Sequence, residues 1–156
     1  MITPRVVKRF DLTKTTFIIP LRIETADRMR NIITTLIYLT RNFACRIIVK
    51  EVDKESVYLR DVQPLLEQAL EPEMMNCITH IFEESDEFTF HRTKILNDML
   101  WMVKTPVVCN YDSDIILPVD SYINATNMIL KGWVHPDAEG GQPVKVVYPY
   151  GLGEYQ

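Results

Sequence analysis

The sequence predicts an α/β fold, a three-layer α/β/α sandwich with a mostly parallel sheet. Short apolar runs rich in β-branched and aromatic residues alternate along the chain with longer segments of helical periodicity. Parallel strands need crossovers of about a dozen residues, and helical crossovers cover both faces of a sheet. With 156 residues, of which 47% are hydrophobic, the chain is long and apolar enough to fold around one core. We therefore predict a single domain over residues 1–156.

Five apolar runs predict the strands. They are residues 16–21, 46–51, 77–82, 106–111 and 144–148. The first run closes with Pro20 and Leu21, and the fourth is entered through Pro106 and left through acidic residues. Bounded runs of this kind are typical of buried strands.

Four segments predict helices. They are residues 26–42, 57–70, 93–103 and 119–130, each with apolar side chains at helical spacing. The first helix has a cap available at Thr25 or Asp27, and the second is interrupted or restarts near Pro64. The glycines and prolines of residues 132–143 predict a surface loop.

The charge and the cysteines exclude several classes of function. A formal net charge of -4 without a block of Lys and Arg argues against a nucleic-acid partner. Cys45, Cys77 and Cys109 lie far apart beside apolar runs, which predicts buried, reduced thiols. The start of the chain lacks the apolar segment of a signal peptide, and no stretch is long and apolar enough to span a membrane. We expect a cytoplasmic protein without a transmembrane segment, and a homo-oligomer stays open.

Two aspartates after the fourth predicted strand form the sharpest candidate site. In parallel α/β sheets, ligands bind outside the carboxyl ends of the strands, where Asp112 and Asp114 follow an apolar run. Two carboxylates at this spacing can share a hard cation, and Mg²⁺ or Mn²⁺ bound in this way keeps positions for phosphate oxygens. A solvated acidic turn is the simpler interpretation of the spacing alone.

Basic residues at the start of the helix 93–103 favour a phosphate ligand. Arg92 and Lys94 lie where the N-terminus of a helix offers backbone donors to an anion. Asn97, about one turn further on, has an amide that can orient a loop or a ligand. For this segment alone, a solvated basic face is the simpler interpretation.

Three ordered motifs resemble those of GT-A glycosyltransferases, near the family 2 and galactosyltransferase-like branches. They are IIPLR at residues 18–22 with Glu24, FHRTKILN at residues 90–97, and VVCNYDSD at residues 107–114. The resemblance covers roughly residues 15–131, and the Asp-x-Asp motif gives it most of its specificity. It implies an enzyme that transfers a sugar from a nucleotide-diphospho-sugar, usually a UDP-sugar, to the hydroxyl of a saccharide or another acceptor.

The same resemblance implies a role for each matching residue. The residues that would bind the nucleotide-sugar donor are Pro20, Arg22 and Glu24 in the nucleotide pocket, Glu51 or Asp53 near the base, Arg92 and Asp112 near the diphosphate, and Asn97 in support. Asp112 and Asp114 would hold a manganese or magnesium ion.

Two departures from the family pattern concern the contact with the nucleobase and the binding of the acceptor. The segment EVDKES at residues 51–56 replaces the usual Asp-Asp-Gly-Ser turn, so the acid that contacts the base stays open between Glu51 and Asp53. The family's chains continue well past the Asp-x-Asp motif into an acceptor-binding half, whereas about forty residues follow Asp114. We therefore expect an absent or abbreviated acceptor half. The candidate general bases are His135, Asp137 and Glu139.

Two other functions stay open. A truncated domain that binds a nucleotide or a partner chain without turnover would carry the same residues. A haloacid dehalogenase-like phosphatase also uses an Asp-x-Asp motif after an apolar strand, with the first Asp as nucleophile. Those enzymes usually have Thr or Val two residues after the second Asp, where this chain has Ile116.

Overall fold

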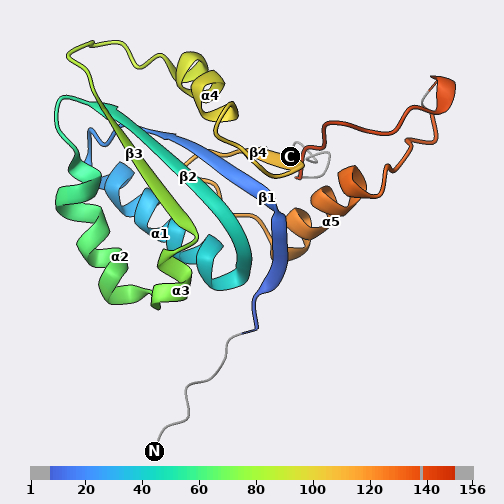
Figure 1. Cartoon of the computed structure of the whole chain (residues 1–156), viewed down its shortest axis with the longest axis horizontal. Helices are drawn as coiled ribbons and strands as arrows, with labels where there is room; N and C mark the ends of the chain where they lie inside the picture. Colours follow the sequence, from blue (N-terminus) through green and yellow to red (C-terminus); the bar gives the residue numbers. More distant parts are fainter. Residues whose placement is uncertain (1–7, 138, 150–156) are drawn as a thin grey trace, which may run out of the picture. The chain divides into compact units, whose positions relative to one another are not determined.

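The chain folds into two compact units, residues 1–115 and 116–156. The computed structural model describes residues 8–137 and 139–149. The first unit contains a four-stranded sheet with the helices up to α4 (Arg92–Leu100), and the second contains α5 (Val119–Leu130) (Figure 1). No helix in the described ranges is both long and apolar enough to cross a bilayer.

The sheet of the first unit is entirely parallel. Its strands are β1 (Phe10–Leu21), β2 (Phe43–Asp53), β3 (Ile78–Glu84) and β4 (Val107–Asn110), in the order β3-β2-β1-β4. The predicted α/β fold with a parallel sheet flanked by helices is therefore confirmed, while the GT-A type stays a prediction. β1 and β2 begin earlier than predicted because Phe10 pairs with Phe43, ahead of a register shift between Asp11 and Thr16.

The helices of the first unit follow the predicted segments closely. α1 (Ala26–Asn42) has the predicted boundaries, and the hydroxyl of its cap Thr25 accepts a hydrogen bond from the N–H of Arg28 at 3.2 Å. The second segment is interrupted as predicted. A π-helical turn, η1 (Tyr58–Val62), runs into α2 (Gln63–Ala69) next to Pro64, which has no N–H to donate. A short helix, α3 (Pro72–Met75), precedes β3.

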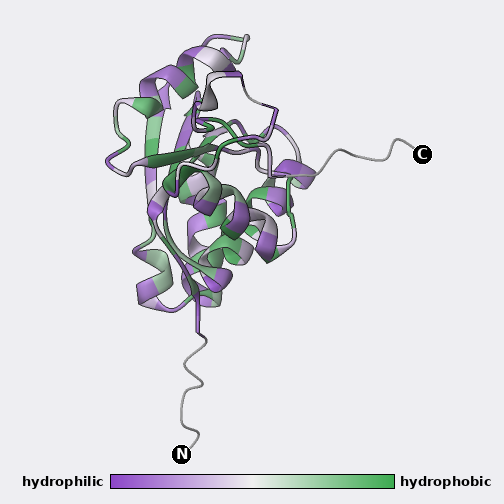
Figure 2. Ribbon diagram, turned by 90° about the vertical axis from the view of Figure 1, so that its right-hand side faces the viewer, coloured by the Kyte–Doolittle hydropathy of each residue, from purple (hydrophilic) through white to green (hydrophobic). Residues whose placement is uncertain are grey.

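Alternation along the strands separates two apolar layers of the core. Ile18 and Ile48 point to the face where they pack against Met99 of α4. The neighbouring strand residue Ile19 points to the opposite face and is fully buried, as is Leu36 of α1, a helix that contacts β2. Figure 2 shows green, hydrophobic stretches on both strands and helices. Helices therefore cover both faces of the sheet.

The second unit is built around α5, whose boundaries agree with the predicted helix. α5 is followed by Gly132, which has a φ of 63° and donates its N–H to the carbonyl of Ile129 at 3.2 Å. The predicted strand at residues 144–148 is wrong, because these residues form no strand and Val146 is 72% exposed. Apolar, β-branched composition makes a strand only where a neighbouring strand pairs with it, and in the described part of this unit the isolated bridge joins Val134 to Pro143, outside residues 144–148.

Candidate functional site

The order of the strands marks one edge of the sheet. β2 and β4 lie on opposite sides of β1, so the connection from β3 to β4 crosses back over β1. Open α/β sheets bind ligands in the crevice outside the carboxyl ends of the strands, where the strand order reverses in this way. β4 pairs with β1 as far as Asn110, opposite Ile18, and Asp112 follows in the next loop. The predicted aspartates therefore lie on the edge where this topology favours a ligand.

Arg92 and Asp112 meet at this edge. α4 begins at Arg92, whose Nη2 atom donates hydrogen bonds to Oδ1 of Asp112 at 2.5 Å and to Oδ1 of Asn110 at 3.3 Å. The side chains of the ion pair are 44% and 48% exposed, so a solute can reach both. The structure thus brings together the two residues that the sequence assigned to a diphosphate and to its metal.

The loop that carries the aspartates is anchored through its backbone. The N–H of Tyr111 donates to the carbonyl of Ile18 at 3.1 Å, which continues the pairing of β4 with β1. On the other side, the hydroxyl of Thr35 in α1 donates to the carbonyl of Ser113 at 2.7 Å. Asp114 follows this anchor and is exposed. The backbone of the loop is fixed to β1 and α1, while the carboxylates remain accessible.

The two carboxylates fit a cation that shares its coordination with a ligand. Mg²⁺ and Mn²⁺ prefer oxygen ligands and are commonly bound by one or two carboxylates together with substrate phosphates. In residues 8–137 and 139–149, no group of three or more His, Cys, Asp or Glu side chains could hold a metal ion. Asp112 and Asp114 are carboxylates of the type that binds such a cation.

Arg22 is buried and holds the loop that leads to α4. Its Nε donates to the carbonyl of Val52 and its Nη1 to the carbonyl of Phe88, both at 2.9 Å. Its guanidinium also lies 5.3 Å from the centre of the Phe90 ring. These contacts connect the end of β1 to the segment just before Arg92. Arg22 acts here through the loop that it positions.

The other predicted residues at the end of β1 differ in exposure. Pro20 is buried within the strand, next to Lys50 in the pairing with β2. Glu24 is exposed and forms an ion pair with Arg28 at 3.2 Å, across the start of α1. Glu24 is therefore the predicted pocket residue of β1 that a ligand at this edge reaches most easily.

Glu51 is a buried structural anchor. Its Oε2 accepts a hydrogen bond from the hydroxyl of Ser56 at 2.5 Å, and its Oε1 accepts from the N–H of Tyr58 at 3.0 Å. The same Oε2 lies 3.1 Å from Nε2 of His80. The carboxylate is inaccessible to solvent. Burial raises the pKa of Glu51, but the hydrogen bonds from His80, Ser56 and Tyr58 outweigh it and hold the pKa below its usual value.

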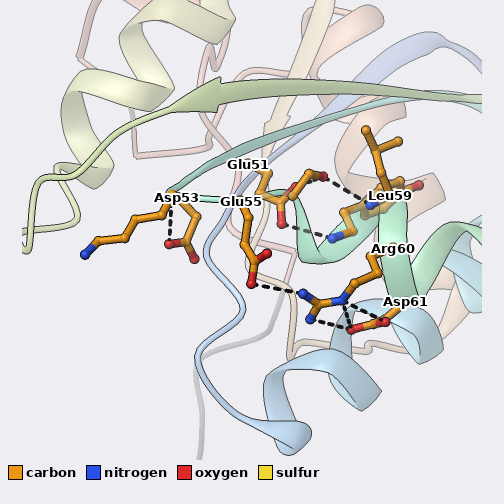
Figure 3. A network of polar contacts seen from close by, with 9 residues as sticks. Glu51, Asp53, Glu55, Leu59, Arg60 and Asp61 are labelled. Atoms are coloured by element: carbon orange, nitrogen blue, oxygen red, sulfur yellow. Dashed lines mark hydrogen bonds and ion pairs between the residues drawn. The ribbon is translucent and has the colours of Figure 1, made fainter.

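Asp53 and Asn97 lie nearer to the surface. Asp53 is half-buried at the end of β2, and its Oδ1 accepts a hydrogen bond from the N–H of Lys54 at 2.8 Å (Figure 3). Glu51 and Asp53 are the two acids predicted to contact the nucleobase. Because Glu51 is enclosed, Asp53 is the one whose side chain is accessible. Asn97 is exposed on α4, about one and a half turns after Arg92.

A buried lysine next to the site was missed in the sequence. Lys50 is buried in β2, and its Nζ lies 2.7 Å from Glu83 and 3.1 Å from Asp98 of α4. Burial lowers the pKa of Lys50, but the hydrogen bonds to Glu83 and Asp98 outweigh it and raise the pKa above its usual value. A lysine inside an apolar run is the signal that could have identified it, because lysines are almost never buried without a partner.

A large hollow lies away from the aspartates. An open groove of about 710 Å³ runs along the amino-terminal part of the sheet, and its lining includes Thr16, Arg46, Thr79 and Met102. Its lining carboxylate, Glu73, is already paired with Arg9. The lining of the groove includes this one carboxylate, whereas the loop after β4 carries two, Asp112 and Asp114, and we place the candidate site at that loop on chemical grounds.

Neither a protein-family model nor any curated protein or solved structure matches this chain.

Proposed function

We propose that this chain binds a nucleotide-diphospho-sugar, most simply a UDP-sugar, at the carboxyl edge of β1 and β4 and transfers the sugar to an acceptor hydroxyl. The observation that carries the proposal is the meeting of Arg92 and Asp112 where the strand order reverses. A diphosphate is recognised by a guanidinium and by a cation bound to carboxylates, and both requirements are met by residues of this edge.

The residues of the proposed site divide into three groups. Arg92 donates hydrogen bonds to the diphosphate, and the start of α4 adds backbone donors of the same kind. Asp112 and Asp114 would hold Mn²⁺ or Mg²⁺, which would offset the charge that develops on the departing diphosphate. Asp53 is proposed to contact the nucleobase of the donor, since the carboxylate of Glu51 is buried and pairs within the fold. Glu24 and Asn97 extend the pocket, whereas Pro20 and Arg22 support it from inside.

The general base is proposed among three residues of the second unit. They are His135, Asp137 and Glu139, all exposed in the loop after α5. His135 accepts a hydrogen bond on Nδ1 from the N–H of Asp137 at 3.1 Å, so its neutral ring carries the proton on Nε2, and Nδ1 is the nitrogen that could receive a proton. Transfer requires a general base to receive the proton of the acceptor hydroxyl as the new glycosidic bond forms.

Binding without turnover is the second candidate function. It is favoured by one specific observation: all the proposed donor-binding residues belong to the first unit. A chain of this kind retains nucleotide binding even when no base reaches the sugar.

The test measures binding and turnover separately on the full chain. UDP binding is followed by calorimetry with Mn²⁺ and with a chelator, and the hydrolysis of a panel of UDP-sugars is followed by release of UDP. The Asp112→Asn variant removes one carboxylate charge at the site. Asp86→Asn is the matched control, because Asp86 is an exposed aspartate in the loop after β3.

Each outcome distinguishes one function. UDP binding that needs Mn²⁺ and Asp112, together with hydrolysis, supports the transferase. The same binding without hydrolysis supports the non-catalytic module. Absence of UDP binding in the presence of Mn²⁺ rejects both, and hydrolysis of a phosphate monoester by the same sample would favour the phosphatase interpretation instead.

A further inference from the structure

The contact between Arg92 and Asp112 has a consequence for how ligands bind. The oxygen of Asp112 that faces the guanidinium of Arg92, at 2.5 Å, is one of the two oxygens that this carboxylate could offer to a cation in the proposed site. A carboxylate oxygen bound to Mn²⁺ or Mg²⁺ lies about 2.0–2.2 Å from the ion. An ion there would lie within about 4–5 Å of the guanidinium, where two like charges repel.

We propose that Arg92 and a divalent cation compete for Asp112, and that Arg92 exchanges this carboxylate for the diphosphate when the cation binds. The inference rests on the proposed function, because it describes how that site is regulated. In the exchanged arrangement, charges alternate from Asp112 to the cation, to the diphosphate and to Arg92. Every charge then has an opposite partner, which neither ligand achieves alone.

Asn110 can hold the side chain of Arg92 in place during the exchange. Its side-chain oxygen accepts a second hydrogen bond from the same Nη2 atom of Arg92, at 3.3 Å. Because the amide is neutral, it neither binds the cation strongly nor repels a phosphate. Asn110 can therefore keep Arg92 at the edge of the sheet after Asp112 has turned to the cation.

The exchange predicts effects of opposite sign from one substitution. Arg92→Met removes the competing cation, so the affinity for Mn²⁺ alone rises by about two- to fivefold, the range that an exposed ion pair supplies. The same variant lacks the donor for the diphosphate, so the affinity for UDP in the presence of Mn²⁺ falls by about tenfold. A residue that only binds the diphosphate would leave the affinity for Mn²⁺ unchanged, and a residue that only supports the fold would lower both.

The experiment uses the full chain and two probes. Free Mn²⁺ is counted by electron paramagnetic resonance during titration without nucleotide, and UDP binding is measured by calorimetry at saturating Mn²⁺. Arg30→Met is the matched control, because Arg30 also belongs to an exposed ion pair, with Asp27 in the first turns of α1. This control loses one positive charge and should leave both affinities within about twofold of the original chain.

A double variant tests whether the gain in Mn²⁺ affinity depends on Asp112. Adding Asp112→Asn to Arg92→Met should abolish the gain in Mn²⁺ affinity, because the gain depends on the carboxylate that Arg92 releases. Circular dichroism verifies that the helices of each variant persist.

The outcomes separate this inference from the proposed function. Suppose that the original chain binds UDP with Mn²⁺ but that Arg92→Met does not raise the affinity for Mn²⁺ in the absence of nucleotide. The competition is then overturned and the proposed function stands. If the affinity for Mn²⁺ rises in Arg92→Met and rises equally in the double variant, the competition does not involve Asp112 and is likewise overturned. If the original chain does not bind UDP at all, the proposed function is rejected together with the exchange.

Discussion

The Nε2 atom of His80 lies 3.1 Å from a carboxylate oxygen of Glu51, and the His80 ring stacks on the ring of Tyr58 with centres 4.0 Å apart. The three residues come from β3, β2 and η1, so the contact joins two strands to the helical turn behind them. Ser56 donates to the same carboxylate oxygen at 2.5 Å. The buried charge is thus surrounded by donors, which is the condition for a stable buried carboxylate.

Glu51→Gln should lower the free energy of unfolding by about 2–3 kcal/mol, measured by urea denaturation at neutral pH. The amide preserves the shape of the side chain but replaces one acceptor oxygen with a donor, so it cannot accept all the hydrogen bonds that Glu51 receives. Glu55→Gln is the control, because Glu55 is exposed and pairs only with Arg60 at the surface (Figure 3). A loss below about 0.5 kcal/mol for Glu51→Gln, equal to that of the control, would contradict the anchoring role.

Stability should decrease on acidification in a way that depends on Glu51. The pKa of Glu51 is lower in the folded chain than its ordinary value of 4.5, so the unfolded chain binds this proton first. The contribution of Glu51 is therefore complete above pH 4.5 and is lost as the pH falls through the lower, folded pKa. Denaturation curves measured from pH 7 to pH 3 should converge for the original chain and Glu51→Gln; a constant difference across this range would contradict the prediction.

Arg22→Met should loosen the segment that leads to α4. The substitution removes the hydrogen bonds to the carbonyls of Val52 and Phe88 and leaves both acceptors without the guanidinium. Hydrogen exchange of the amides of residues 85–91 should accelerate by about tenfold. Arg30→Met serves as the control, since Arg30 pairs only at the surface of α1. Unchanged exchange in residues 85–91 would show that Arg22 does not position this segment.

Asp114→Ala should abolish the binding of UDP that depends on Mn²⁺ and leave the fold intact. The side chain is exposed, so its removal creates no cavity and shifts the melting temperature by less than about 2 °C. Calorimetry with UDP and Mn²⁺ measures the binding, and circular dichroism the melting temperature. Asp86→Ala is the matched exposed aspartate. UDP binding by Asp114→Ala equal to that of the control would remove Asp114 from the site.

Local sequence was sufficient for most elements of the fold. The apolar spacing of residues 26–42 and 119–130 predicted α1 and α5 with their observed boundaries, since helix periodicity and caps are encoded within one segment. Strand boundaries were less accurate, because pairing with a neighbour decides them. β1 extends to Phe10 through its pairing with Phe43, whereas residues 144–148 have strand composition without a strand.

The sequence by itself determined where acidic and basic side chains follow the strands, and the tertiary structure decided what each side chain contacts. Glu51 and Asp53 are equivalent candidates in the sequence and lie on the same face of β2, but the carboxylate of Glu51 is enclosed by donors of β3 and η1, while Asp53 at the end of the strand remains accessible. Arg92 and Asp112 are twenty residues apart, and they meet because α4 begins at the carboxyl edge where β4 ends. Side-chain type is a property of one residue, whereas desolvation and pairing depend on segments that only folding brings together.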